Sequence, residues 1–242
     1  MPEDQSDPTQ PLIVDAHLDI AYNAIVLKRD LSLPVTEIRQ SERHTPPPDT
    51  GAGISMVSWP TLIEGGVAVV GGSIFVDPYR KAHPKTTATY RTPEEAHAQG
   101  IAQLDYYRRI GEARSDVTLL DDEDKLNEVL ASWEGERPTV GIFVVMEGAD
   151  PIQDPSELPW WIERGLRGVG LSWSAGTRYA GGNANPGSQT DEGLALLDTM
   201  ADYNLLLDVS HLWEEAAFRA LDRYPGPIVA THANPRTFVN NP

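Results

Sequence analysis

Histidine and carboxylate side chains follow several short apolar segments of this chain. One segment near the N-terminus runs into His17 and Asp19, and another runs directly into Glu147. Two further segments, nearer the C-terminus, end at His211 and His232. Imidazoles and carboxylates are the ligands that remain for zinc when a protein has no cysteine, and this sequence has none. These five residues are therefore candidate ligands of divalent metal ions.

Each candidate also has a simpler interpretation when it is taken alone. A His-x-Asp pair such as His17 and Asp19 is more often a hydrogen-bonded strand end, and Glu147 could equally turn toward solvent at the end of its strand. Convergence favours the metal site, because three of the six histidines stand at strand ends. The other three fall in polar loops or on a charged helix and are interpreted as solvated: His44, His83 and His97. Five donors from four strands fit two zinc ions that share one carboxylate.

Only parallel strands would bring these side chains to one place. Short runs rich in β-branched residues predict buried strands at residues 12–16, 67–76, 140–146, 168–172, 205–209 and 228–230. Segments with helical spacing lie between them, at residues 93–114, 121–133, 155–163, 191–203 and 213–223. Residues 41–53 contain three consecutive prolines and are predicted to form a surface loop. Strands and helices thus alternate along the chain.

Alternating strands and helices predict a parallel sheet covered by helices, either doubly wound or closed into a barrel. No glycine-rich phosphate loop follows the first strand, so a doubly wound cofactor-binding protein is disfavoured. Polar residues instead collect at the carboxyl ends of several strands, where barrel enzymes have their active sites. We therefore expect an α/β fold of the TIM-like (β/α)-barrel type, as one domain over residues 11–242 after a disordered polar tail at residues 1–10.

The composition excludes some classes of binding partner. A formal net charge of −17, with scattered basic residues, argues against binding to nucleic acid or to an anionic membrane. No apolar stretch reaches the roughly 18 residues that a bilayer requires, and residues 1–10 do not have the pattern of a signal peptide. We expect a cytoplasmic protein.

Four short motifs, taken in order, resemble the metal motifs of the membrane (renal) dipeptidase family of zinc metallopeptidases. They are Asp15-Ala16-His17-Leu18-Asp19, Glu147-Gly148-Ala149, Asp208-Val209-Ser210-His211-Leu212 and Thr231-His232-Ala233-Asn234. The segment Leu62-Ile63-Glu64-Gly65-Gly66-Val67 also resembles the entry to the second strand of that family. The resemblance extends from residue 12 to the end of the chain.

The resemblance implies a role for each candidate ligand. His17 and Asp19 would bind one zinc ion, His211 and His232 would bind the other, and Glu147 would bridge the two as the catalytic carboxylate. A metal-bridging hydroxide would then attack the peptide bond of a small dipeptide. Among the remaining motif residues, two carboxylates are expected to orient the metal-bound imidazoles, unless they serve only as hydrogen-bond partners at strand ends: Asp15 and Asp208. Analogy with the family also implies a homodimer.

The sequence departs from the family at two places. Trp173 stands where the family has a histidine that contacts substrate, so Arg178 or Tyr179 could take over recognition of the substrate carboxylate. Arg178 could also be a loop arginine in solvent. The family's barrel has eight strands, and its substrate-binding arginine and proton-transferring aspartate would lie beyond Pro242. We therefore expect a barrel without its last two strands and leave the activity of the chain itself open.

These observations favour a zinc-dependent dipeptidase. One alternative keeps the barrel and both metals but changes the substrate to a lactam, a lactone or an N-acyl amino acid, as Trp173 would permit. A second alternative, from a different functional class, is a non-catalytic barrel that binds zinc. Metal dependence and a profile of hydrolysed substrates would separate the three.

Overall fold

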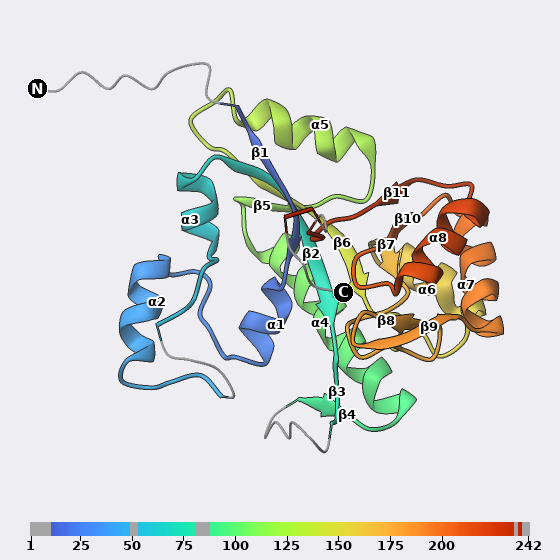
Figure 1. The fold of residues 1–242 in the computed structure, drawn as a ribbon. Helices are drawn as coiled ribbons and strands as arrows, with labels where there is room; N and C mark the ends of the chain where they lie inside the picture. The colour runs from blue at the N-terminus through green and yellow to red at the C-terminus, as the bar shows by residue number, and fades with distance from the viewer. Residues whose placement is uncertain (1–10, 49–52, 81–87, 235–236, 239–242) are drawn as a thin grey trace, which may run out of the picture.

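Seven parallel strands form the central sheet of the molecule (Figure 1). The computed structural model describes residues 11–48, 53–80, 88–234 and 237–238. Six strands follow one another across the sheet in the order β1 (Ile13–Leu18), β2 (Val67–Phe75), β6 (Val140–Glu147), β7 (Leu166–Gly170), β10 (Leu206–Asp208) and β11 (Ile228–Val229). A seventh strand, β5 (Val117–Leu119), pairs with the first residues of β6. The sheet curls as part of a TIM-like barrel, with β1 and β11 as its described edges.

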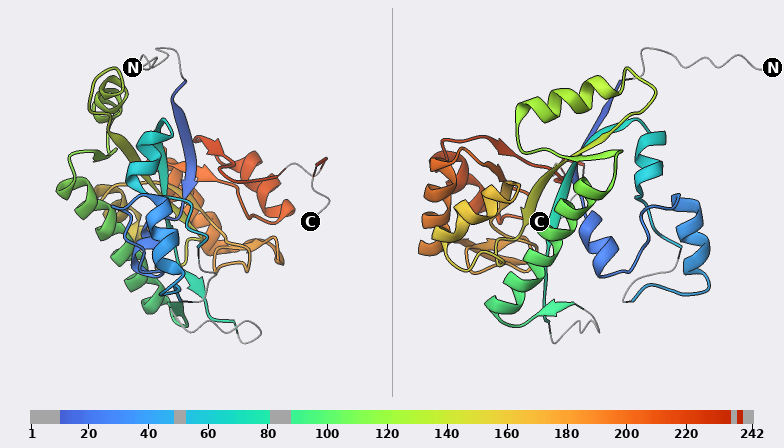
Figure 2. Two further views of the ribbon diagram at one scale, coloured as in Figure 1. Left: turned by 90° about the vertical axis from the view of Figure 1, so that its left-hand side faces the viewer. Right: turned by 180° about the vertical axis from the view of Figure 1, so that it is seen from behind.

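Helices connect the strands and cover the sheet, as the right-hand view in Figure 2 shows for α4. They are α1 (Ile20–Ile25), α2 (Val35–Glu42), α3 (Trp59–Glu64), α4 (Pro93–Ala113), α5 (Glu123–Ser132), α6 (Leu158–Glu163), α7 (Asp191–Asp202) and α8 (Glu214–Arg223), with a short 3-10 turn, η1 (Pro155–Glu157), before α6. Thr92 caps α4 by accepting a hydrogen bond from the backbone N–H of Glu95, as Ser or Thr does at many helix starts. None of the described helices is long and apolar enough to cross a membrane.

The sequence predicts the central strands of the sheet well because they are buried on both faces, whereas the edge strand β1, which the sequence also predicts to be buried, is exposed at Ile13 and Val14. Every residue of β6 except Phe143 is buried, and β2 is buried from Ala68 to Phe75. Such strands appear in the sequence as continuous apolar runs, which is typical of parallel sheets covered by helices. The six predicted strands and the five predicted helices all correspond to elements of the structure, with end points that differ by up to two residues.

Several short elements are absent from the sequence-based prediction. They are β5, the helices α1 to α3, the small parallel pair of β3 (Asp77–Pro78) and β4 (Thr89–Tyr90), and the antiparallel hairpin of β8 (Ala180–Gly182) and β9 (Asn185–Gln189). The predicted loop at residues 41–53 overlaps the end of α2, and residues 49–52 lie outside the described part of the chain. The predicted tail at residues 1–10 also lies outside it.

Strand β1 bulges where it carries the first candidate ligand. The register runs from Asp15 opposite Val70 to Leu18 opposite Gly72, so Ala16 and His17 together face one residue of β2. That residue is Gly71, and a Cβ there would come within 2.1 Å of the carbonyl oxygen of Ala16. Only glycine therefore allows the bulge, which redirects the strand at its functional end.

Tyr107 of α4 ties this bulged region to the rest of the fold. Its side chain is fully buried, and its hydroxyl accepts a hydrogen bond from the backbone N–H of Ala21 at 3.1 Å and donates one to the carbonyl of Ser73 at 2.8 Å. One hydroxyl thus joins α4, the first turn of α1 and β2. Asp19 directly precedes α1, so this contact also fixes the carboxyl end of β1.

We expect Tyr107→Phe to destabilise the protein by about 1–3 kcal/mol, because it leaves a buried N–H and a buried C=O without their partner. Urea denaturation, followed by circular dichroism, measures this free energy of unfolding. Tyr203→Phe is the control, since Tyr203 is 48% exposed and should tolerate the change. Equal stability of the two variants would show that Tyr107 does not join these elements.

Candidate metal centre

The five predicted ligands meet at the carboxyl end of the sheet. His17 lies in the bulge of β1 and Asp19 just after that strand, Glu147 is the last residue of β6, and His211 and His232 come just after β10 and β11. Parallel strands place their carboxyl ends on one side of a sheet, so five residues that are far apart in the sequence become neighbours. Two groups of three lie close enough to hold a metal ion, and both contain Glu147: His17, Asp19 and Glu147, and Glu147, His211 and His232.

The carboxylate of Glu147 stands at the centre of these contacts. Its Oε1 lies 2.9 Å from Nε2 of His211 and 3.2 Å from Nε2 of His232. Its Oε2 lies 3.4 Å from Nε2 of His17, and that nitrogen is 3.7 Å from Oδ1 of Asp19. The two oxygens of one carboxylate therefore face different sets of ligands. This is the arrangement that a carboxylate bridging two ions requires.

The charges of the centre depend on one another in the metal-free protein. Burial alone would raise the pKa of Glu147, but the imidazoles of His17, His211 and His232 hold it well below its usual value. Burial alone would lower the pKa of His17, but the carboxylates of Asp19 and Glu147 outweigh it and raise that pKa to about 10. The ionised carboxylate thus needs positive charge beside it.

Hydrogen bonds to the far side of two imidazoles aim their other nitrogens at Glu147. His211 Nδ1 lies 3.2 Å from Oδ1 of Asn183, and His232 Nδ1 lies 2.8 Å from the hydroxyl of Thr231. Both partners act as acceptors here, so each Nδ1 carries the proton and each Nε2 of a neutral ring has only a lone pair. The two Nε2 atoms are nevertheless 2.9 Å apart. Such converging acceptors repel one another unless a proton or a metal ion lies between them.

The donor set fits zinc. A tetrahedral zinc ion with bonds of about 2.0–2.1 Å has its ligand atoms about 3.3 Å apart. The separations around Glu147, from 2.9 to 3.7 Å, straddle that value. Nitrogen and carboxylate oxygen are also ligands that zinc accepts, and the chain has no cysteine to compete. The chain's own residues therefore suit a pair of zinc ions.

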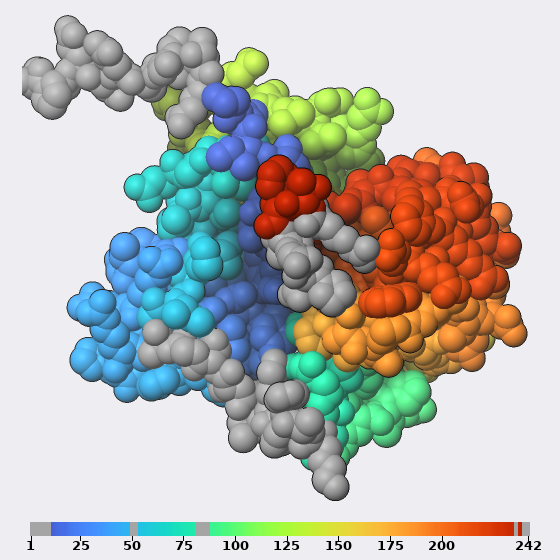
Figure 3. Space-filling view, in the orientation of Figure 1, coloured from blue at the N-terminus to red at the C-terminus, as the bar shows by residue number. Residues whose placement is uncertain are grey.

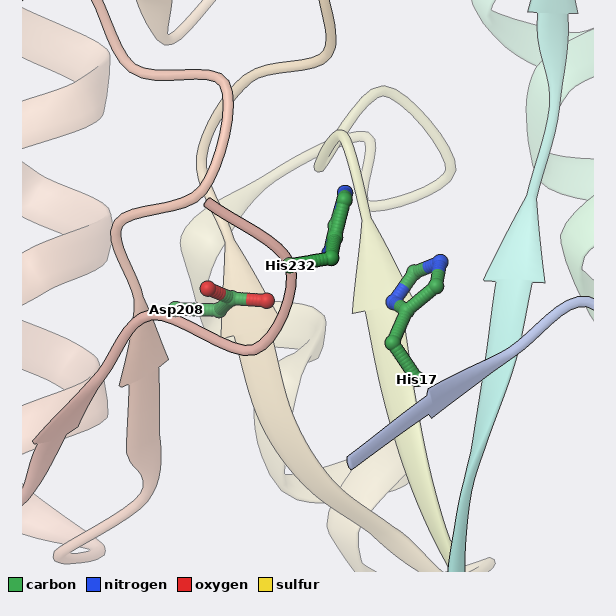
Figure 4. A group of neighbouring side chains, drawn as sticks. All are labelled: His17, Asp208 and His232. Carbon is green, nitrogen blue, oxygen red and sulfur yellow. The ribbon is translucent and has the colours of Figure 1, made fainter. Parts of the chain in front are cut away.

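A relay through Thr231 sets the orientation of His232. The Thr231 hydroxyl donates its single proton to Oδ2 of Asp208, so it accepts a hydrogen bond from Nδ1–H of His232. Oδ1 of Asp208 accepts hydrogen bonds from the backbone N–H groups of Ser210 and Thr231. Figure 4 shows His17, Asp208 and His232 around a common space, and these three form a further group that could hold a metal. Because both oxygens of Asp208 already accept hydrogen bonds, Asp208 acts here through Thr231.

His211 is held by the β8–β9 hairpin, a contact that the sequence does not reveal. Its backbone has a φ of 63°, a left-handed conformation that is unfavourable for a residue with a Cβ. The carbonyl of His211 accepts a hydrogen bond from the backbone N–H of Asn183, at 2.9 Å, while the Asn183 side chain accepts from its ring. Asn183 thus fixes both the backbone and the ring of His211.

Ser73 of β2 and Asp15 of β1 support the other side of the centre. The buried hydroxyl of Ser73 donates a hydrogen bond to Oδ1 of Asp19. Oδ1 of Asp15 accepts a hydrogen bond from the backbone N–H of His17, at 3.1 Å, and so stabilises the bulge. Nδ1 of His17 is buried without a hydrogen-bond partner in the described part of the chain.

This side of the centre opens to solvent. His17 and Asp19 line a cavity of about 500 Å³ between β1, α1 and residues 54–67. Figure 3 shows β1 and α1 at the bottom of the furrow beside the residues that lead into α3. Asp19 is 42% exposed, so small molecules can reach this edge of the centre.

The three predicted substrate contacts lie in different surroundings. Trp173 stands beside the centre, with its ring centroid 6.3 Å from that of His211. Tyr179 is fully buried and donates its hydroxyl proton to the carbonyl of Ile152, so it is already paired in the core. The guanidinium of Arg178 pairs with Glu192 at 2.9 Å. The structure therefore brings together the five candidate metal ligands and Trp173. Arg178 and Tyr179 instead pair with Glu192 and with the carbonyl of Ile152.

Comparisons with known proteins agree with this centre. The model of the family described as "Membrane dipeptidase (Peptidase family M19)" matches residues 9–242. A relative from Acinetobacter calcoaceticus, described as "Uncharacterized protein in PQQ-III 3'region", is 27% identical over 183 residues. The match covers 68% of this chain and 56% of that protein. The chain thus spans just over half the length of this curated relative.

Two solved structures share the fold. A metallo peptidase from Rhodobacter sphaeroides, bound to a phosphinate mimic of the dipeptide L-Ala-D-Ala, superimposes with a TM-score of 0.70 at 22% identity, over 93% of this chain and 66% of that one. The probable dipeptidase PvdM from Pseudomonas aeruginosa superimposes with a TM-score of 0.71 at 18% identity, over 97% of this chain and 55% of that one.

We expect Thr231→Val to weaken zinc binding about 10- to 100-fold, because His232 loses the acceptor that orients its ring. Competition with a chromophoric chelator measures the affinity. Thr231→Ser should restore it, since serine keeps the hydroxyl, and Thr199→Val is the control because the Thr199 hydroxyl donates to the carbonyl of Ala195 within α7. Unchanged affinity in Thr231→Val would show that the relay does not orient His232.

The metal-free protein should lose stability as the pH rises from about 6.5 to about 10. The pKa of His17 is raised from 6.5 to about 10 on folding, so its contribution is complete below 6.5 and disappears as the pH passes 10. The lowered pKa of Glu147 has the opposite sign: its contribution is complete above about 4.5 and is lost gradually as the pH falls below that value, so it does not change between 6.5 and 10. Thermal melts in the presence of a chelator should show this decline, and Glu147→Gln should flatten it. An equally steep decline in that variant would contradict the assignment.

Proposed function

The chain belongs to the membrane dipeptidase family, and from this we propose that it is a zinc-dependent dipeptidase whose two metal ions share Glu147. The observation that carries the proposal is the position of the Glu147 carboxylate, with Oε2 toward His17 and Oε1 toward His211 and His232. A buried carboxylate surrounded by three imidazoles serves no evident structural purpose. Two metal ions that share this carboxylate would explain the positions of all five side chains.

The protein's own residues would hold the reacting groups in place. When bound, a pair of zinc ions would lower the pKa of a water molecule and polarise the carbonyl of the peptide bond. Glu147 would keep the ions at a fixed separation, and Thr231 and Asn183 would keep the lone pairs of His232 and His211 directed at them. Trp173 would form an apolar wall beside His211, which limits the access of bulk water.

The size of the site supports a small substrate. The cavity beside His17 and Asp19, about 500 Å³, would accommodate a dipeptide. The related metallo peptidase from Rhodobacter sphaeroides was solved with a phosphinate mimic of L-Ala-D-Ala, so a protein of this fold accepts a ligand of that size. Both observations support a dipeptide as the substrate class.

Trp173 favours a second candidate within the same chemistry. Its indole offers one hydrogen-bond donor and cannot be protonated, so it supplies no acid beside the centre. A lactam, a lactone or an N-acyl amino acid lacks the free amino group of a dipeptide. Such a compound would therefore place fewer polar groups against the indole. Hydrolysis of these compounds at rates above those for dipeptides would favour the second candidate.

The proposed function is tested by measuring metal content and hydrolysis together. We expect about two zinc ions per chain and hydrolysis of a dipeptide panel, and we expect Glu147→Ala to lose one or both ions and to reduce kcat/KM at least 10³-fold because it removes the shared ligand. Glu37→Ala is the matched control, since Glu37 is an exposed carboxylate on α2.

The outcomes separate the hypotheses. Zinc binding without hydrolysis of any peptide, lactam, lactone or N-acyl amino acid would favour a non-catalytic barrel. Failure of the folded protein to bind zinc would overturn the proposal. Equal activity of Glu147→Ala and Glu37→Ala would show that Glu147 does not bridge the ions.

A further inference from the structure

We propose that Arg80 binds a carboxylate of the substrate at the mouth of the metal centre. The inference rests on the proposed function, and it names a specificity-determining residue that the sequence did not single out. Arg80 follows β3, only a few residues beyond the carboxyl end of β2. Phe75, at that end, pairs in register with Glu147, so the chain leaves the sheet beside the shared carboxylate.

Contacts with Trp173 place the guanidinium of Arg80 next to the centre. Its Cζ lies over the indole, 4.8 Å from the ring centroid. The same indole packs against Phe75, with centroids 5.0 Å apart, and against His211, with centroids 6.3 Å apart. Trp173 therefore contacts both a candidate metal ligand and Arg80. An arginine stacked in this way is held in one orientation without losing its hydrogen-bond donors.

Arg80 has N–H groups available for a ligand, whereas two other arginines of this region form close ion pairs with carboxylates of the protein. Arg29 pairs with Glu42 at 2.6 Å and Arg178 pairs with Glu192 at 2.9 Å. The described carboxylate partner of Arg80 is Asp77, at the longer distance of 3.4 Å. Nε of Arg80 is buried without a hydrogen-bond partner among the described residues, and its side chain is 35% exposed. A guanidinium has five N–H groups, so Arg80 can bind a carboxylate without giving up Asp77.

The charge of the molecule favours such a cation. The formal net charge is −17, and the centre itself contains the carboxylates of Asp19 and Glu147. An anionic substrate would be repelled by this surface unless a cation faced it at the site. A partly desolvated arginine is well suited, because it forms two parallel hydrogen bonds with a carboxylate.

The distances suit a dipeptide. The indole of Trp173 contacts both groups: its ring centroid lies 4.8 Å from Cζ of Arg80 and 6.3 Å from the ring centroid of His211. In a dipeptide, one residue of about 3.5 Å separates the scissile carbonyl from the terminal carboxylate. A hydrogen-bonded guanidinium adds about 3–4 Å beyond that carboxylate. This reach is of the same order as the contacts that connect His211, Trp173 and Arg80, and we therefore place the substrate carboxylate toward Arg80.

The test compares a dipeptide with its C-terminal amide and with an amide whose second residue is glutamate. The dipeptide carries a terminal carboxylate, its amide carries none, and the glutamate amide carries a carboxylate on its side chain. Binding to the metal-free protein is measured by calorimetry, and kcat/KM is measured for the zinc-loaded protein. We expect the wild type to favour carboxylate over amide about 10- to 100-fold, and Arg80→Met to remove this preference while zinc content stays unchanged. Arg80→Lys should recover part of it.

Arg91→Met is the matched control, because Arg91 is an exposed arginine that stacks on Tyr79, 3.5 Å from the ring centroid, as Arg80 stacks on Trp173. It should keep the full preference. An undiminished preference in Arg80→Met, or its loss in Arg178→Met instead, would overturn the role of Arg80 and leave the proposed function standing. If the zinc-loaded wild type neither binds nor hydrolyses any member of the panel, the proposed function fails, and this inference fails with it.

Discussion

The buried carboxylate of Glu147 is the constraint on which the functional end of this molecule depends. It is the last residue of a strand buried on both faces, and an ionised group in such a place is stable only with positive charge or hydrogen bonds beside it. The three imidazoles supply that compensation, and Nε2 of His211 and Nε2 of His232 lie only 2.9 Å apart, so a proton or a metal ion must lie between them. The electrostatics of the metal-free centre therefore favour binding of a metal ion before any substrate is considered.

The parallel sheet makes this convergence possible at little conformational cost. Each ligand sits at or just beyond the end of a strand of one hydrogen-bonded sheet whose central strands, β2 and β6, are buried, so none of the ligands depends on a long loop. Two exceptions to regular geometry coincide with the candidate ligands. The bulge at His17, which requires Gly71, and the left-handed backbone of His211, which the β8–β9 hairpin stabilises, both lie where a ligand must be aimed away from the normal strand direction.

The sequence predicts the strands and the proximity of His17, Glu147 and His211 for a physical reason. Buried parallel strands produce continuous apolar runs, and polar residues that interrupt such runs at their carboxyl ends share one edge. The partners of those residues leave no such pattern. Asn183 lies in a short polar hairpin, and Thr231 receives its role only from contacts with Asp208 and His232. Hydrogen bonds between separate elements depend on side-chain orientation, which hydrophobic periodicity does not encode.

The residue proposed to bind the substrate carboxylate could not be predicted from the sequence either, because its position depends on contacts between separate elements. In sequence, Arg178 is the arginine nearest Trp173, so it is the natural candidate. The intervening loop folds back on itself, with the backbone N–H of Gly176 donating to the carbonyl of Trp173, and Arg178 is directed toward Glu192. Arg80, far away in sequence, reaches the indole across β3. The replacement of a titratable residue by Trp173 thus gains a physical meaning, because an apolar face beside the metal centre gives a guanidinium a surface on which it is oriented and partly desolvated.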